Sequence, residues 1–179
     1  MSTHVALLRG INVGGKNRLL MKDLTAIFEN VGCKDVRTYI QSGNVVFDAK
    51  KSLVPKISKM VADSAERAHK VQVPILLRSV DAFAVLVKQN PFLKSGADPK
   101  TCHVAFLRDI PSKKLIDELD SNRSPGDAFE VVGSEIYLHC PNGMARTKLT
   151  TTYFDKKLAT VTTVRNWNTI LKLSAMLAD

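Results

Sequence analysis

The spacing of hydrophobic residues over the first 80 positions predicts an α+β unit. Short apolar runs at residues 4–9, 36–40, 45–47 and 74–78 indicate strands, whereas apolar residues three or four apart over 20–31 and 53–65 indicate amphipathic helices. Gly32 follows the first helical pattern and is expected to end that helix. The segment 41–44, Gln-Ser-Gly-Asn, is typical of a hairpin turn between the second and third strands. This order of elements predicts a ferredoxin-like β-α-β-β-α-β unit.

The chain from residue 101 repeats this order. Residues 103–108, His-Val-Ala-Phe-Leu-Arg, nearly match residues 4–9, His-Val-Ala-Leu-Leu-Arg. A helix after Ser112, strands at 129–132 and 136–140, and a helix at 149–158 follow, so we favour a duplication. The last strand, at 159–164, is weak, so the second unit is expected to be incomplete or modified, with a final helix at 166–177. We therefore predict an α+β fold of tandem ferredoxin-like units at 1–80 and 101–179, joined by a helical connector at 81–100.

Composition narrows the class of protein. The 179 residues contain no apolar run near the roughly 20 residues that span a bilayer, so we expect no membrane segment. Three cysteines without a Cys-x-x-Cys spacing favour a reduced, cytoplasmic protein. The net charge of +9 attracts anionic small molecules or nucleic acid, although charge also serves solubility. Oligomeric state does not follow from these numbers.

The segment 9–17 is the first candidate for chemistry. Residues 10–17 read G-x-x-x-x-G-K-N, one residue from a P-loop, but Asn17 lacks the hydroxyl that would hold magnesium. The hairpin after the helix also departs from the parallel unit in which P-loops occur, so we reject a P-loop NTPase. A glycine-rich turn that leads into a helix start can present backbone N–H groups to an anion. Equally, its glycines can serve only a tight turn that needs positive φ.

Three further segments carry polar residues at turns or helix starts. The turn at 41–44 needs no function. Arg146 and Lys148 precede a helix, where acidic residues are usual, which mildly favours an anionic partner. Asn166 and Asn168 flank the only tryptophan, Trp167, at another helix start. A helix cap with a core anchor is the favoured interpretation, and a base-stacking or amide-recognition patch is the alternative.

Three of these segments carry a family resemblance. Residues 8–15 (LRGINVGG), 39–47 (YIQSGNVVF) and 163–173 (TVRNWNTILKL) resemble, in this order, the bacterial family called domain of unknown function 1697. The resemblance covers nearly the whole chain. It implies two ferredoxin-like units and implies no activity. Where the family usually has Ser-Lys-Leu, this chain has Thr-Lys-Leu at 147–149, which keeps the hydroxyl.

The candidate segments are rich in cations and amides and contain no Asp, Glu or His, the residues that general acid–base catalysis usually needs. We therefore expect a binding module for a phosphorylated ligand, either a nucleotide or nucleic acid, with no cofactor and no metal. An outside carboxylate such as Asp23 could join the site, so the alternatives are an enzyme acting on a small anionic metabolite or a structural, partner-binding protein. The candidate ligand-binding residues, expected to converge on one cleft, are Arg9, Asn12, Gly14, Gly15, Lys16, Asn17, Ser42, Asn44, Arg146, Lys148, Arg165, Asn166 and Asn168.

The dipeptides Cys102-His103 and His139-Cys140 are expected to lie side by side on neighbouring strands of the second unit. Because side chains alternate along a strand, each face receives only part of this set. We expect Cys102 and Cys140 on the helix-covered face and the two histidines paired on the opposite face. Because the four side chains are divided between two faces of the sheet, they cannot form the tetrahedral ligand set of a structural zinc site.

Overall fold

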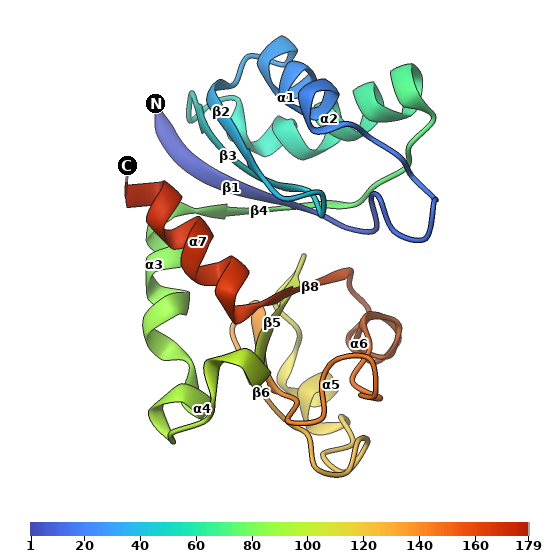
Figure 1. Cartoon of the computed structure of the whole chain (residues 1–179), viewed down its shortest axis with the longest axis vertical. Coiled ribbons are helices and arrows are strands. Elements are labelled where there is room, and N and C mark those ends of the chain that lie inside the picture. The colour runs from blue at the N-terminus through green and yellow to red at the C-terminus, as the bar shows by residue number, and fades with distance from the viewer. Residues whose placement is uncertain (179) are drawn as a thin grey trace. The chain divides into compact units, whose positions relative to one another are not determined.

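Two four-stranded antiparallel sheets with helices form the protein, as a computed structural model that describes residues 1–178 shows (Figure 1). The chain divides into a first unit, residues 1–84 with residues 173–178, and a second unit, residues 85–172. No helix within the described residues is long and apolar enough to cross a membrane. The protein is thus mixed α+β, as the hydrophobic pattern predicts.

The first unit follows the predicted order of elements. These are β1 (Ser2–Leu8), α1 (Met21–Asn30), β2 (Lys34–Tyr39), β3 (Asn44–Ala49), α2 (Val54–His69) and β4 (Ile75–Ser79). The sheet order is β2-β3-β1-β4, and helices α1 and α2 lie on the same side of it (Figure 1). The predicted helix end is confirmed: Gly32, at a φ of +99°, follows α1, and the Cys33 amide donates to the Phe28 carbonyl at 3.0 Å.

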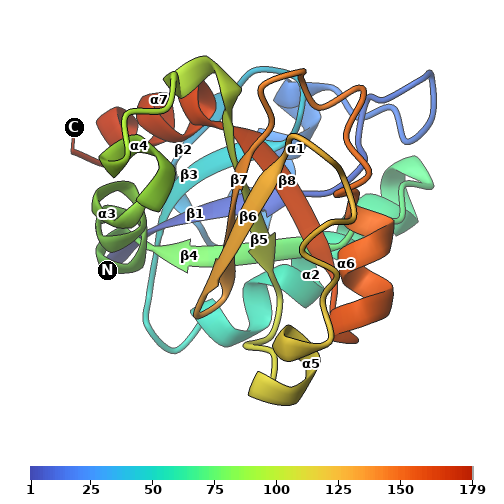
Figure 2. The same cartoon turned by 90° about the horizontal axis from the view of Figure 1, so that it is seen from below.

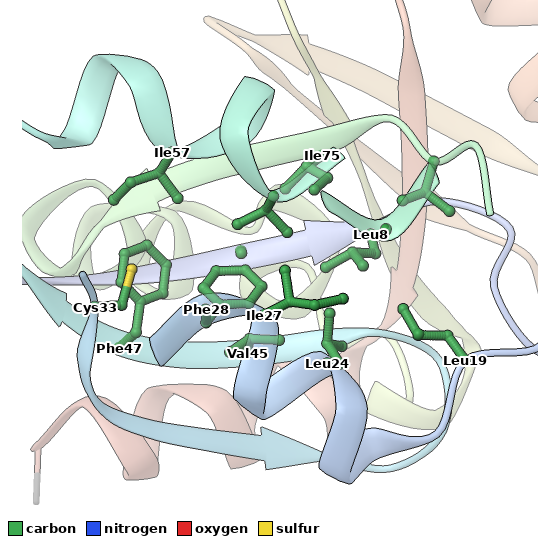
Figure 3. Close-up of a cluster of buried hydrophobic side chains, with 14 of the residues drawn as sticks. Leu8, Leu19, Leu24, Ile27, Phe28, Cys33, Val45, Phe47, Ile57 and Ile75 are labelled. Atoms are coloured by element: carbon green, nitrogen blue, oxygen red, sulfur yellow. The ribbon is translucent and has the colours of Figure 1, made fainter. Parts of the chain in front are cut away.

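The core of the first unit lies between its sheet and these two helices (Figure 3). Leu8 of β1 and Phe47 of β3 are fully buried, as are Phe28 of α1 and Ile57 of α2. The rings of Phe28 and Phe47 meet with centroids 5.1 Å apart. Burying each such side chain contributes about 1.5–3 kcal/mol, so this cluster fixes where β1 ends and the following loop begins.

The second unit is reached through α3 (Val80–Gln89), α4 (Pro91–Lys94) and a 3-10 turn (Pro99–Thr101). Its elements are β5 (Cys102–Leu107), α5 (Lys113–Asp117), β6 (Ala128–Val132), β7 (Glu135–His139), α6 (Thr151–Leu158), β8 (Thr162–Asn166) and α7 (Trp167–Ala178). Asn90 follows α3, and its side chain caps α4 by accepting from the Phe92 amide at 3.0 Å.

The last strand of the second unit is complete, contrary to our expectation. Strand β8 starts three residues later than predicted and pairs with β5 over five residues, so the sheet order is β6-β7-β5-β8 (Figure 2). Ala159, at a φ of +51°, ends α6 in the left-handed region and shifts the start of the strand. The strand carries threonines, an arginine and an asparagine, which explains its weak hydrophobic signal.

The faces of β5 are the reverse of our prediction. Cys102 lies opposite His139, so the two dipeptides are neighbours as expected. However, the helix-covered core contains Ala105, Leu107, Ile136, Leu138 and Cys140. Cys102 therefore shares the other face with His139, and His103 lies on the core side opposite Leu138. The predicted histidine pair is wrong, because β5 is apolar on both faces and its sequence does not indicate which face the helices cover.

Candidate functional site

The loop between β1 and α1 contains a small hairpin. Val13 and Lys16 form an isolated bridge, and the Lys16 amide donates to the Val13 carbonyl at 3.0 Å. Gly14 and Gly15 occupy the two central positions at φ values of +56° and +76°, as a two-residue turn of the primed type requires. The tight turn is therefore confirmed. Its glycines do not lead directly into the helix, because α1 begins at Met21.

Asn12 holds this loop in place with its side chain. Its Nδ2 donates to the carbonyls of Leu19 and Gln41, both at 2.9 Å, and its Oδ1 accepts from the Leu19 amide at 2.9 Å. Asn17 closes the base of the hairpin, since its Nδ2 donates to the Gly10 carbonyl at 3.1 Å. Both donor hydrogens of the Asn12 amide thus serve the protein itself. This residue shapes the loop and ties it to the turn at 40–43.

A cavity of about 390 Å³ lies against this loop. It is lined by Asn12, Gly15, Arg18, Leu19, Leu20, Asp23 and Gln41. Leu20 is the N-cap of α1, and its side chain has no oxygen to accept from the first turn. Backbone N–H groups at the start of a helix carry partial positive charge. The cavity therefore combines a guanidinium, a helix start and a carboxylate.

The turn at 40–43 is shaped by Gly43. A Cβ atom at this position would lie 2.7 Å from the Leu8 Cβ and 2.8 Å from the Ile11 Cδ1, and φ is +76°. Next to it, Asn44 is fully buried and donates from Nδ2 to the Tyr39 carbonyl at 3.1 Å and to the Ser42 Oγ at 2.9 Å. Ser42, Gly43 and Asn44 thus form the hairpin turn that the sequence predicts.

The candidates before α6 lie in a loop. Arg146 and Lys148 are exposed, and α6 starts at Thr151, two residues later than expected. Thr150 caps this helix by accepting from the Tyr153 amide. The hydroxyl of Thr147 accepts from the Leu149 amide at 3.1 Å and is 3.4 Å from the Ser124 Oγ. The family hydroxyl is therefore part of the loop structure.

Arg165 lies within β8 and is only 8% exposed. Its Nη1 donates to the Thr163 Oγ1 and to the Val164 carbonyl, both at 2.9 Å. Burial lowers the pKa of the Arg165 guanidinium to about 10. Because this cation is buried and bonds to residues of its own strand, Arg165 contributes to the structure of the strand and not to an open surface.

Asn166 follows Arg165 and caps α7, accepting from the Thr169 amide at 2.8 Å. Trp167 is buried beside it, which confirms the interpretation of a cap with a core anchor. Asn168 is exposed.

Comparison with known proteins places the chain in a family. The model of the protein family of unknown function DUF1697 matches residues 1–137. The chain belongs to the DUF1697 family. The match contains the loop, the cavity and the turn, and ends before the segment 163–173.

A solved structure shows a similar fold. It is that of conserved bacterial protein SP0830 from Streptococcus pneumoniae, with 24% sequence identity, a TM-score of 0.68 and coverage of 98% of each chain. No curated protein matches the sequence.

The candidate residues of this DUF1697 protein fall into two sets. The first unit contains Arg9, Asn12, Gly14, Gly15, Lys16, Asn17, Ser42 and Asn44, and the second contains Arg146, Lys148, Arg165, Asn166 and Asn168. Within the first unit, the Asn12–Gln41 bond joins the loop to the turn. Convergence of the two sets on one cleft stays a prediction. Within residues 1–178, no three His, Cys, Asp or Glu side chains are grouped to hold a metal ion.

Three polar residues that line the cavity of this DUF1697 protein are not among the predicted ligand-binding residues. Arg18 lies just beyond the motif 8–15, Gln41 belongs to the predicted turn, and Asp23 is predicted only as a carboxylate outside the motifs. One signal was present: residues 9–22 contain four basic and no acidic side chains. That cluster indicated a cationic loop that extends to the helix start.

Proposed function

We propose that this protein binds a small phosphorylated ligand in the cavity between the loop 9–20 and the turn 40–43. The observation that supports this proposal is the cavity of about 390 Å³, which is lined by Gly15, Arg18 and the start of α1. Sites for small molecules are usually clefts of about 300–1,000 Å³ with a few polar groups. This size favours a small ligand over a track for a nucleic-acid chain.

The charge of the loop supports an anionic ligand. Arg18 lines the cavity, Lys16 is exposed beside Gly15, and no acidic residue occurs from residue 9 to residue 22. Arginine binds phosphate through paired charge-assisted hydrogen bonds. Backbone N–H groups at the start of α1 favour negative charge in the same place. Asn12 acts indirectly, because its amide holds the loop that carries these groups.

Binding is favoured over catalysis because the lining residues include one carboxylate, Asp23, and no histidine. Asp23 nevertheless supports the second candidate function, an enzyme acting on a small anionic metabolite, in which this carboxylate would serve as general base. The Asp23→Asn variant separates the two. A binding module retains affinity for phosphate, because a like charge has been removed, whereas an enzyme loses turnover of its substrate.

The experiment that tests the proposal is a calorimetric or NMR titration of the full chain with inorganic phosphate and with AMP. Arg18→Gln should weaken binding roughly 10- to 100-fold, the effect of losing a charge-assisted hydrogen bond of about 1.5–3 kcal/mol. Arg108→Gln is the matched control, since it removes an exposed arginine of the second unit and changes net charge equally. Equal affinities of the two variants, or no phosphate binding by the wild type, would contradict the proposal.

A nucleic-acid partner would give a different result. Its binding should fall steeply with salt, because the +9 charge would release counterions from the polymer. Oligonucleotide retention on a filter at low salt, and absorbance at 260 nm of the purified protein, measure this directly. Retention that Arg18→Gln leaves unchanged would place polymer binding outside the cavity.

We further propose that the chain is a tandem pair of ferredoxin-like units with residues 81–100 as connector. The matching element order supports this arrangement. A ligand-bound crystal structure tests the expected convergence of the candidate residues, which side chains of Arg9, Asn44 and Arg165 more than about 20 Å apart would contradict. The three buried free thiols also favour a reducing, cytoplasmic location.

A further inference from the structure

Exposed apolar side chains occur on the two segments that line the same cavity. Eight large hydrophobic residues are well exposed within residues 1–178, and three of them belong to this region of the first unit. Leu20 lines the cavity and is 59% exposed. Val13, 64% exposed, follows the lining residue Asn12 in the chain, and Ile40, 50% exposed, precedes the lining residue Gln41. The cavity is thus lined by one cationic side chain, Arg18, and one exposed apolar side chain, Leu20, and further exposed apolar residues stand next to lining residues in the chain.

Ile40 has an unusual backbone conformation. Its φ is +49°, in the left-handed region that a β-branched residue adopts rarely and at a cost. Burial in the core does not compensate for this cost, because half of the side chain stays in solvent. Asparagine or glycine would fit the same turn without strain. The turn therefore keeps a strained apolar side chain where a polar residue would be more stable.

A phosphate group by itself also leaves most of the cavity empty. The lining combines one guanidinium, the Gly15 turn and the Gln41 amide on one hand with the side chains of Leu19 and Leu20 on the other. Ligand sites are usually largely apolar, with a few polar groups that fix orientation. An occupant that matches this lining has one anionic end and one apolar end.

We infer that the ligand is a phosphate monoester that carries an apolar or aromatic group. Arg18 and Lys16 hold the phosphate, and the apolar group packs on Leu20, Val13 and Ile40. This inference rests on the proposed function and adds the class of ligand. A strained Ile40 is then explained by the contact it offers to the organic part of the ligand, since the same turn needs no isoleucine for folding.

The experiment compares inorganic phosphate, n-hexyl phosphate and AMP in titrations of the full chain. We expect n-hexyl phosphate or AMP to bind at least tenfold more tightly than inorganic phosphate, and the tighter of the two identifies an alkyl or an aromatic group. Ile40→Asn should weaken that ligand severalfold, leave inorganic phosphate unchanged and raise the urea midpoint of unfolding. Ile110→Asn is the matched control, an apolar side chain 75% exposed in the second unit, and should leave both affinities unchanged.

The outcomes separate this inference from the proposed function. Arg18-dependent binding of inorganic phosphate, with no gain for either organic phosphate, would overturn the inference and leave the proposed function standing. An Ile40→Asn variant that loses inorganic phosphate and the organic ligand equally would also overturn it, because the residue would then act only on the loop. Absence of binding for all three probes would overturn both.

Discussion

The two units share one backbone frame, by which we mean the same pattern of backbone hydrogen bonds between their strands. In the first, the Leu8 amide donates to the Gly43 carbonyl at 2.8 Å, and in the second the Leu107 amide donates to the Ser134 carbonyl at 2.8 Å. The next residue also matches, since the amides of Arg9 and Arg108 donate to carbonyls before the fourth strand of each unit, at 3.0 and 2.9 Å. Such agreement shows that strand pairing is common to both units.

The loops that connect the first strand to the first helix differ between the two units, although the strand pairing is the same. The connection from β1 to α1 spans residues 9–20 and contains the glycine hairpin and the cavity, whereas β5 to α5 spans only residues 108–112. Ser112 and Thr150 cap the helices of the second unit with hydroxyls, while Leu20 stands at the start of α1. Binding sites are usually carried by loops on a conserved scaffold. The loop 9–20, which has no counterpart in the second unit, is therefore the better candidate for a binding site.

The same comparison explains Arg165. It lies opposite Val104 across the β5–β8 pair, as Arg78 lies opposite Val5 across β1–β4. Each guanidinium donates from Nη1 to the carbonyl of the preceding residue at 2.9 Å. A feature present in both units belongs to the frame that they share. This repetition favours a structural role for Arg165, with the ligand chemistry in the first-unit loop.

The largest expected effect concerns the turn at 40–43, which joins β2 to β3. Gly43→Ala should destabilise the protein by roughly 3 kcal/mol or more, because the new methyl group meets Leu8 and Ile11 and the backbone stays left-handed. Its counterpart Ser134→Ala should cost about 0.5 kcal/mol. Urea unfolding followed by circular dichroism measures both. Similar losses would mean that the two turns are not as different as their backbones indicate.

A smaller effect separates the loops. Asn12→Ala should cost roughly 2 kcal/mol and abolish phosphate binding, because the Leu19 and Gln41 backbone groups lose their partner. Thr147→Val in the second unit removes a comparable loop bond and should cost a similar amount without changing phosphate affinity. Unfolding and titration of both variants check this. Loss of phosphate binding in Thr147→Val would place part of the site in the second unit.

The dependence of stability on alkaline pH tests whether the hydrophobic cores of the two units exclude solvent equally. Burial raises the thiol pKa from 9.0 to about 11 for Cys33 in the first unit and for Cys140 in the second. Between pH 9 and 11 the unfolded chain loses these protons first, so stability should fall as pH rises, by roughly 2 kcal/mol per thiol at pH 11.

Cys33→Ala and Cys140→Ala should each flatten this dependence by the same amount. Urea midpoints at pH 8, 9, 10 and 11 provide the measurement, with the double variant as control. A flattening by only one of the two substitutions would show that the core of the other unit already admits solvent.

The smallest effect distinguishes two exposed glycines. Gly15→Ala and Gly133→Ala both place a methyl group in open space at positive φ, so each should cost about 1 kcal/mol. Only Gly15→Ala should weaken phosphate binding, since Gly15 lines the cavity. Thermal unfolding and phosphate titration give the two readouts. Equal affinity of both variants would remove the Gly15 turn from the site.

Sequence reasoning succeeded where the signal was local. The turn at Gly43, the Asn166 cap and the Trp167 anchor depend on neighbours within a few residues, and they are present as predicted. At 14–15 the structure contains the tight turn, which was one of two interpretations left open. It failed at β8, whose polar residues hide a strand stabilised by β5, and at the faces of β5, where both faces are apolar. Of the cavity residues, Arg18 lies outside the motif 8–15, whereas Gln41 lies within the motif 39–47 but is not among the predicted ligand-binding residues.

By itself, the sequence determined the order of the elements, the positions of the tight turns and a cationic loop without acidic residues. These features follow from periodicity, backbone preference and charge, which are properties of adjacent residues. Only the tertiary structure decided that the loop meets the turn at 40–43, that Asp23 and Arg18 line one cavity, and that Arg165 is buried. Each of these depends on contacts such as that between Asn12 and Gln41, 29 positions apart, which no local pattern encodes.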